Sequence, residues 1–103
     1  VDELYRSVDV LVGPSQPITA PTLLEQSVEI NGTRIGTTAA VTQYSRPYNI
    51  TGTPAITIPC GFSESGMPIG LQIAGKAFDE ATVLQIAHAY ESTTEWHLQH
   101  PQI

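Results

Sequence analysis

The sequence predicts an α/β fold in which a mixed-sheet layer carries flanking helices. Three observations support this class: an apolar run at positions 8–12, two neighbouring segments in which apolar and polar residues alternate, and a terminal stretch with apolar residues at helical spacing. The order is strand, long connection with a helical segment, two strands, and helix. A chain of 103 residues has the size of one ordinary domain, so we expect a single domain over residues 1–103.

The first strand is expected in VDVLVGP, where a nearly continuous apolar run from Val8 to Val12 is ended by Gly13 and Pro14. A run of this kind is typical of a strand that is buried on both faces. The preceding VDELYRS has the composition of the last turns of a helix.

A long connection follows. SQPITAPTLLEQSVEINGTRIG has two prolines and no sustained period, and its Asn31-Gly32 turn signal predicts a short hairpin around Ile30 and Ile35. Next, TTAAVTQYSRPYN predicts a short helix. Pro47 forbids a continuous one and disfavours the α conformation for Arg46.

Two strands are predicted at 55–62 and 68–75, after Gly52 and Pro54 have reset the backbone. Pro59 cannot donate a hydrogen bond to a neighbouring strand, so we expect a bulge or an end there. The SESG sequence between the two segments supplies a turn. The pair should therefore form an antiparallel hairpin.

The last element is predicted as a helix that begins after Asp79 and runs to about Thr93. Asp79 is a candidate N-cap, and Phe78 is placed to pack against Val83 as a hydrophobic staple. The apolar stripe of this helix consists of Val83, Ile86, Ala87 and Tyr90, with Leu84 alongside.

Charge and composition exclude several classes of protein. Ten acidic residues against four Lys and Arg give a net charge of -6 and a pI near 4.7, which argues against a nucleic-acid partner. The longest apolar run is far shorter than the ~20 residues that a membrane span needs. One cysteine, Cys60, excludes an internal disulfide and a zinc knuckle. We expect a cytoplasmic protein with no membrane partner and no cofactor.

The residues show no complete set of catalytic groups. There is no G-x-S-x-G elbow, and Ser63 and Ser65 lie in a predicted turn with no base nearby. Cys60 follows a proline on the apolar side of a strand, which favours a small core residue over a nucleophile.

The histidines near the end of the chain are better explained as solvated side chains than as metal ligands. A metal site would need His97 and His100 with His88 or Glu91 behind them, and the first two lie past the predicted helix. Trp96 is expected to pin the end of the helix against the body of the protein. The charged side chains of Lys76, Glu80 and Glu91 are expected to face water.

Four stretches, taken in order and spacing, resemble the carboxyl-terminal part of the amidase signature family: NITGTPAITIPCGF, GMPIGLQIAG, FDEATVLQIAHAYE and TEWH. The match covers roughly Val8 to His97. The residues that carry it are Asn49, Gly52, Pro54, Pro59, Gly61, Gly66, Pro68, Gly70, Leu71 and Gln72.

The resemblance implies a part of a large α/β/α sandwich built around a mixed sheet. It implies that Asn49 hydrogen-bonds the backbone, that Gly52 and Pro54 turn the chain into a strand, and that Gly61 and Gly70 allow close backbone approach. Family amidases use a Ser, cis-Ser, Lys triad with an oxyanion-binding loop. All of these groups lie upstream of the matched region, so no catalytic residue is expected here, and the chain alone is predicted to be inactive.

Within the family, the glutamyl-tRNA amidotransferase A subunits resemble this chain closely. They place an acid seven residues before the motif asparagine, where it meets the amine of glutamine. The corresponding position here is Thr42, which cannot pair with an ammonium group. YSRPYN is more similar to amidases that act on less polar amides. If the chain contacts substrate, we expect the contacts at Thr42, Tyr44 and Arg46.

Three hypotheses remain open at this stage. The first is a carboxyl-terminal amidase segment that forms scaffolding and a pocket wall, partnered by the missing amino-terminal amidase region. The second is a module that associates with another copy of itself through exposed apolar surface. The third is a small metal or thiol enzyme that uses His97, His100 or Cys60.

Overall fold

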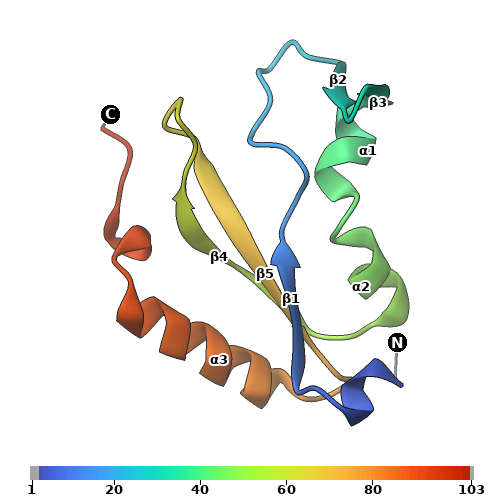
Figure 1. Ribbon diagram of the computed structural model, residues 1–103, viewed down its shortest axis with the longest axis vertical. Coiled ribbons are helices and arrows are strands. Elements are labelled where there is room, and N and C mark those ends of the chain that lie inside the picture. The colour runs from blue at the N-terminus through green and yellow to red at the C-terminus, as the bar shows by residue number, and fades with distance from the viewer. Residues whose placement is uncertain (1–2, 103) are drawn as a thin grey trace.

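The computed structural model describes residues 3–102 and confirms the α/β class (Figure 1). The elements follow the predicted order of strand, long connection with a helical segment, two strands and helix, and the long connection contains a β-hairpin. The elements are η1 (Leu4–Arg6), β1 (Val10–Pro14), β2 (Ser27–Ile30), β3 (Thr33–Gly36), α1 (Thr37–Thr42), α2 (Arg46–Thr51), β4 (Ala55–Phe62), β5 (Pro68–Gly75), α3 (Glu80–Thr93) and η2 (Trp96–Leu98).

The central sheet has the strand order β1-β5-β4, and both pairings are antiparallel. The β4–β5 hairpin is as predicted. Its register shifts between Pro59 and Gly61, so the bulge expected at the proline is confirmed. Strands β2 and β3 form a separate antiparallel hairpin around Asn31 and Gly32, both at positive φ, which confirms the turn predicted there.

Helices lie on both sides of the central sheet. Figure 1 shows α3 on one side and α1 with α2 on the other. The core forms on the α3 side, where Ile58 and Ile73 of the sheet pack against Val83 and Ala87 of the helix. Ile73 is 1% exposed, so the middle of β5 is the best buried part of the protein.

The predicted bounds of α3 are confirmed, because the helix begins after Asp79 and ends at Thr93. Asp79 occupies the N-cap position, but its side chain makes no capping hydrogen bond to the backbone. The predicted staple is wrong. Phe78 has a φ of +64° and is 94% exposed, so its ring turns away from Val83. The Asp79 carboxylate instead accepts a hydrogen bond of 2.8 Å from the hydroxyl of Thr82.

The prediction that the first strand is buried on both faces is also wrong. Val8 and Val12 are 42% and 58% exposed. Helix α3 packs on β4 and β5, and β1 lies at the edge of the sheet beyond that coverage. An apolar run therefore identified the strand correctly but not its burial.

The helical segment is divided as Pro47 requires, into α1 and α2. Arg46 nevertheless begins α2, so the expectation that it avoids the helix is wrong. Pro47 occupies the first turn of α2, where its missing N–H has no helical partner to lose. Within residues 3–102, no helix combines the length and the apolar character needed to cross a membrane.

Candidate functional site

The three predicted pocket residues lie at the junction of α1 and α2. The Thr42 hydroxyl donates to the Thr38 carbonyl at 2.8 Å, and its oxygen accepts a hydrogen bond of 2.9 Å from Nη2 of Arg46. Thr42 is the last residue of α1 and Arg46 the first of α2, so this hydrogen bond spans the turn between the two helices. The structure therefore brings these two side chains together.

Tyr44 is fixed from the central sheet. Nε2 of Gln72 donates to the Tyr44 carbonyl oxygen at 3.1 Å, across 28 positions of sequence. Because a carbonyl only accepts hydrogen bonds, this contact sets the orientation of the Gln72 carboxamide. Gln72 is 7% exposed and lies in β5. The central strand thus holds the backbone of the α1–α2 junction in place.

A cavity of about 360 Å³ lies between this junction and the sheet. Tyr44 and Gln72 both line it, whereas Thr42 and Arg46 do not. Sequence reasoning missed the other lining residues. Two of them could have been found from the alternation of side chains in β1, which puts Leu11 and Gly13 on the opposite face from Val10 and Val12. The lining residues are Leu11, Val12, Gly13, Pro14, Gln43, Tyr44, Pro47, Tyr48 and Gln72.

A second cavity, of about 520 Å³, lies between the loop after β1 and the β4–β5 hairpin. The hydroxyl of Ser15 donates to that of Thr57 at 3.1 Å at its edge. A Cβ atom on Gly70 would stand 2.7 Å from Ser15 Oγ and 2.8 Å from Thr57 Cγ2. A Cβ at Gly70 would therefore clash with two side chains, whereas the resemblance implied a close approach of backbone.

The other motif residues shape the backbone. Gly52 ends α2 in the left-handed conformation at a φ of 70°, and the Pro54 carbonyl accepts a 2.9 Å hydrogen bond from the N–H of Gly75. At Gly61 no close approach is seen, because a Cβ placed there would have no atom within 4 Å. Glycine is favoured at this position by its φ of +152° instead. Asn49 lies exposed in α2, and its side chain makes no hydrogen bond to residues 3–102.

The Tyr5 hydroxyl, in η1, is buried near Tyr48 of α2. Its side chain is 6% exposed, and its oxygen has no hydrogen-bond partner in the described part of the chain. Burial raises the pKa of the Tyr5 phenol above 10.0, and neighbouring Tyr48 raises it further. The phenol therefore stays neutral at physiological pH.

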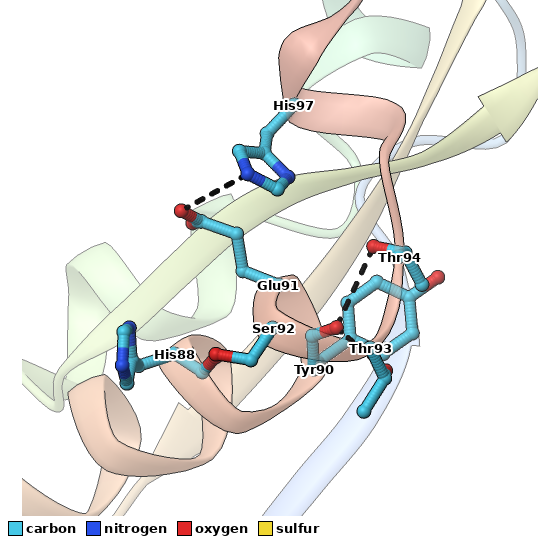
Figure 2. Close-up of polar contacts among 7 residues, drawn as sticks. All are labelled: His88, Tyr90, Glu91, Ser92, Thr93, Thr94 and His97. Atoms are coloured by element: carbon cyan, nitrogen blue, oxygen red, sulfur yellow. Dashed lines mark hydrogen bonds and ion pairs between the residues drawn. The ribbon is translucent and has the colours of Figure 1, made fainter.

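The terminal histidines do not form a metal centre. Figure 2 shows the His97 imidazole turned toward Glu91, with Nε2 3.7 Å from Oε1, while His88 points away from both. His100 is exposed. Between residues 3 and 102, no three His, Cys, Asp or Glu side chains are grouped closely enough to hold a metal ion.

The remaining candidates have structural surroundings. Trp96 packs edge-on against Phe62 of β4, with ring centroids 6.1 Å apart, and pins the chain after α3 as predicted. Cys60 is half-buried, with Sγ 3.5 Å from the Ile69 carbonyl. The hydroxyls of Ser63 and Ser65 lie 2.9 Å apart within the hairpin turn. Lys76 and Glu80 are exposed, as expected, and Glu91 is partly exposed.

Comparisons with known proteins converge on one family. The glutamyl-tRNA(Gln) amidotransferase A subunit of Nostoc sp. is 40% identical over 102 residues, covering 99% of this chain and 20% of the relative. A solved vestigial protein complex that bears on the origins of an s-triazine catabolic enzyme is 31% identical with a TM-score of 0.89, over 97% of this chain and 22% of that one. The 6-aminohexanoate cyclic dimer hydrolase is 29% identical with a TM-score of 0.83, over 98% and 22%.

The chain thus spans about a fifth of the length of the curated relatives that it matches. The family model for amidases matches residues 1–84, which is most of the 103 residues. On this match the chain belongs to the amidase family.

Proposed function

We propose that this chain forms one wall of the substrate pocket of an amide-hydrolysing enzyme, and that the catalytic groups come from polypeptide outside these 103 residues. The observation that carries the proposal is the hydrogen bond from Gln72 to the Tyr44 carbonyl. It ties the junction where substrate contacts are predicted to the best buried strand of the sheet. A segment fixed in this way can orient a substrate without reacting with it.

The family membership supports amide C–N bond hydrolysis as the chemistry of the parent enzyme. The resemblance to family amidases implies that a lysine acts as base through a bridging serine, and that a second serine attacks the amide carbonyl. No serine of the matched motifs inherits these roles. Ser63 and Ser65 hydrogen-bond each other within a turn, and Ser15 pairs with Thr57.

The character of the junction favours an amide without a positive charge. Thr42 stands where the glutamyl-tRNA amidotransferases place an acid, and the Arg46 guanidinium donates a hydrogen bond to its hydroxyl. Among the described residues, Arg46 has no carboxylate within ion-pair distance. An ammonium group at this position would meet a cation and no anion, so we propose an uncharged substrate.

We further propose a cytoplasmic setting, because the single cysteine is a free thiol. The partner in this proposal is the remaining polypeptide of an amidase. No cofactor is required for the proposed reaction.

A graft tests the function. The matched segment of the Nostoc sp. relative would be replaced by this chain, and hydrolysis of propionamide and glutamine would be measured beside the isolated 103-residue chain. We expect no turnover by the isolated chain and turnover of propionamide by the graft. Thr42→Asp in the graft should raise kcat/KM for glutamine relative to propionamide by about 10- to 100-fold, since one charge-assisted hydrogen bond is gained.

Thr38→Asp is the matched control, because it places the same charge one turn earlier in α1. It should leave the ratio unchanged. Hydrolysis by the isolated chain above the blank, or glutamine use by the unmodified graft at the level of the Nostoc sp. relative, would overturn the proposal.

A second candidate function is self-association. Leu23 and Leu24 are 102% and 92% exposed on a turn that Thr22 and Glu25 close, with the Thr22 N–H donating to the Glu25 carboxylate at 3.0 Å. Two ordered, exposed leucines form an apolar projection suited to a protein partner. Sedimentation of the isolated chain tests this function. The wild type should associate with rising concentration, and a Leu23→Ser, Leu24→Ser variant should remain monomeric.

A further inference from the structure

The carboxamide of Gln72 uses only one of its two ends within the protein. Nε2 donates to the Tyr44 carbonyl, but Oε1 accepts no hydrogen bond from residues 3–102. The side chain is more than nine-tenths buried and lines the 360 Å³ cavity. Oε1 is not closed off from solvent, because the buried side-chain atoms without a partner are those of Tyr5 and His97, so it is available to accept a hydrogen bond from a group in the cavity.

The cavity has the size and lining of a small-molecule site. Its volume falls within the range of about 300–1,000 Å³ that ligand pockets occupy. Tyr44, Pro47 and Tyr48 line one side, and Leu11 with Gly13 lines the other. Apart from the carboxamides of Gln43 and Gln72 this lining is apolar or aromatic, and it holds no charged residue. It suits a flat, uncharged group.

We infer that the cavity beside Gln72 is a binding site for a flat, uncharged group that carries an N–H or O–H donor, and that Gln72 Oε1 is the acceptor that selects it. The inference rests on the proposed function in one respect, since it makes the cavity a specificity site of the substrate pocket. A carboxylate is disfavoured there, because it would place an anion against a carbonyl oxygen with no cation in the lining.

Two flat, uncharged probes of similar size, one with N–H donors and one without, test the site. Benzamide has two N–H groups, whereas methyl benzoate has the same ring and a carbonyl but no donor. Each would be titrated into the 103-residue chain and into the Nostoc sp. graft, with binding followed by NMR at the side-chain amide of Gln72. We expect benzamide to bind about tenfold more tightly, which corresponds to one hydrogen bond to Gln72 Oε1.

A cavity-filling variant locates the site. Gly13 is the direct strand partner of Gln72, and a Cβ on it would meet nothing within 4 Å. Its φ lies outside the left-handed region, so Gly13→Val fills the cavity without straining the backbone. It should abolish benzamide binding. Gly36→Val is the matched control, because Gly36 also has free space at Cβ and lies outside the cavity. It should retain binding.

Equal affinity for the two probes would overturn the inference, as would benzamide binding by Gly13→Val or no binding to either the chain or the graft. Binding to the isolated chain is measured where no turnover is expected, so the outcomes of the binding and hydrolysis experiments can be told apart. Hydrolysis by the graft without selective benzamide binding defeats this inference alone, and selective binding without hydrolysis defeats only the proposed function.

Discussion

The two faces of the central sheet are built differently. On the α3 face, Ile58 and Ile73 meet Val83 and Ala87 in a dry core. On the opposite face, the principal link is one hydrogen bond from Gln72 to the Tyr44 carbonyl, beside a cavity of about 360 Å³. Strand β5 contributes residues to both faces, because neighbouring residues such as Gln72 and Ile73 point to opposite sides of the sheet.

This difference separates stability from recognition. The α3 face removes apolar surface from water, which is the main favourable contribution to folding. The α1–α2 face keeps an unfilled cavity and an acceptor that no described residue uses, and these are the features on which the proposed binding role rests. Five substitutions test how far the division holds.

The largest effect is expected at Ile73, which is 1% exposed in the α3 face. Ile73→Ala should lower the free energy of unfolding by about 2–5 kcal/mol, because it leaves a cavity in the core. Urea unfolding followed by circular dichroism measures it. Ile50→Ala is the control, at a side chain that is 78% exposed. A loss at Ile73 no greater than at Ile50 would contradict the assignment of the core.

The second prediction tests the hydrogen bond from Gln72 to the Tyr44 carbonyl, on the α1–α2 face of the sheet. Gln72→Met keeps the length of the side chain but leaves the Tyr44 carbonyl without its donor, and should lower the free energy of unfolding by about 1–3 kcal/mol. Hydrogen exchange at Gln43 to Ser45 should speed up at the same time. Gln99→Met, at an exposed residue, should change neither quantity. Unchanged exchange in the Gln72 variant would mean that this bond does not hold the junction.

Gly70 tests close packing at the second cavity. Gly70→Ala should lower stability by about 1–3 kcal/mol, since the new methyl would clash with Ser15 and Thr57. Gly13→Ala has free space and should instead raise stability by about 0.4–1 kcal/mol, through the unfolded state. Adding Thr57→Ser to Gly70→Ala should recover part of the loss. Equal effects at the two glycines would rule out the clash as the cause.

Tyr5 gives a smaller effect with a distinct pH dependence. Tyr5→Phe removes a buried hydroxyl that has no described partner, and should raise the free energy of unfolding by about 1 kcal/mol at neutral pH. Burial raises the pKa of Tyr5, so above 10.0 the unfolded state releases this proton before the folded state does. Wild-type stability should therefore fall as the pH rises past 10.0, and the variant should fall less. Parallel pH profiles would refute this role.

The smallest effect is expected away from both faces. Arg34 and Glu29 lie 3.9 Å apart on the β2–β3 hairpin, with side chains about 60% exposed. Glu29→Gln should change stability by about 0.5 kcal/mol or less, because exposed ion pairs contribute little. Differential scanning calorimetry in low and high salt provides the measurement. A loss as large as that of Gln72→Met would show that the hairpin carries stability of its own.

Local patterns predicted most of the fold. The alternation in β4 and β5, the Asn31-Gly32 turn and the helix start after Asp79 are predictions that the structure confirms. These features depend on neighbours in sequence. The errors came where tertiary packing decides the outcome. The apolar run in β1 does not show that α3 covers only the neighbouring strands. The predicted staple failed because the sequence gives no sign that Phe78 adopts a positive φ.

The candidate site was predicted less completely. Motif similarity identified Gln72 and the Thr42–Arg46 segment, but not their connection, because the bond from Gln72 to Tyr44 joins residues 28 positions apart. Leu11, Gly13 and Tyr48 have no distinctive chemistry and become cavity residues only when β1 and α2 are brought opposite each other. The motif singled out Gly70 but not its close neighbours Ser15 and Thr57, because the position of Ser15 depends on the course of a loop without periodicity.

The strand order β1-β5-β4 leaves two outer borders, and these differ in how readily a foreign strand could add to them. Along β4, Pro59 and the register shift beside it break the row of backbone donors. Along β1, Val10 to Gly13 run without interruption until Pro14. Growth into aggregates by strand addition should therefore proceed from the β1 border. A lysine at outward-facing Val12 would be the simplest change to keep concentrated samples dispersed.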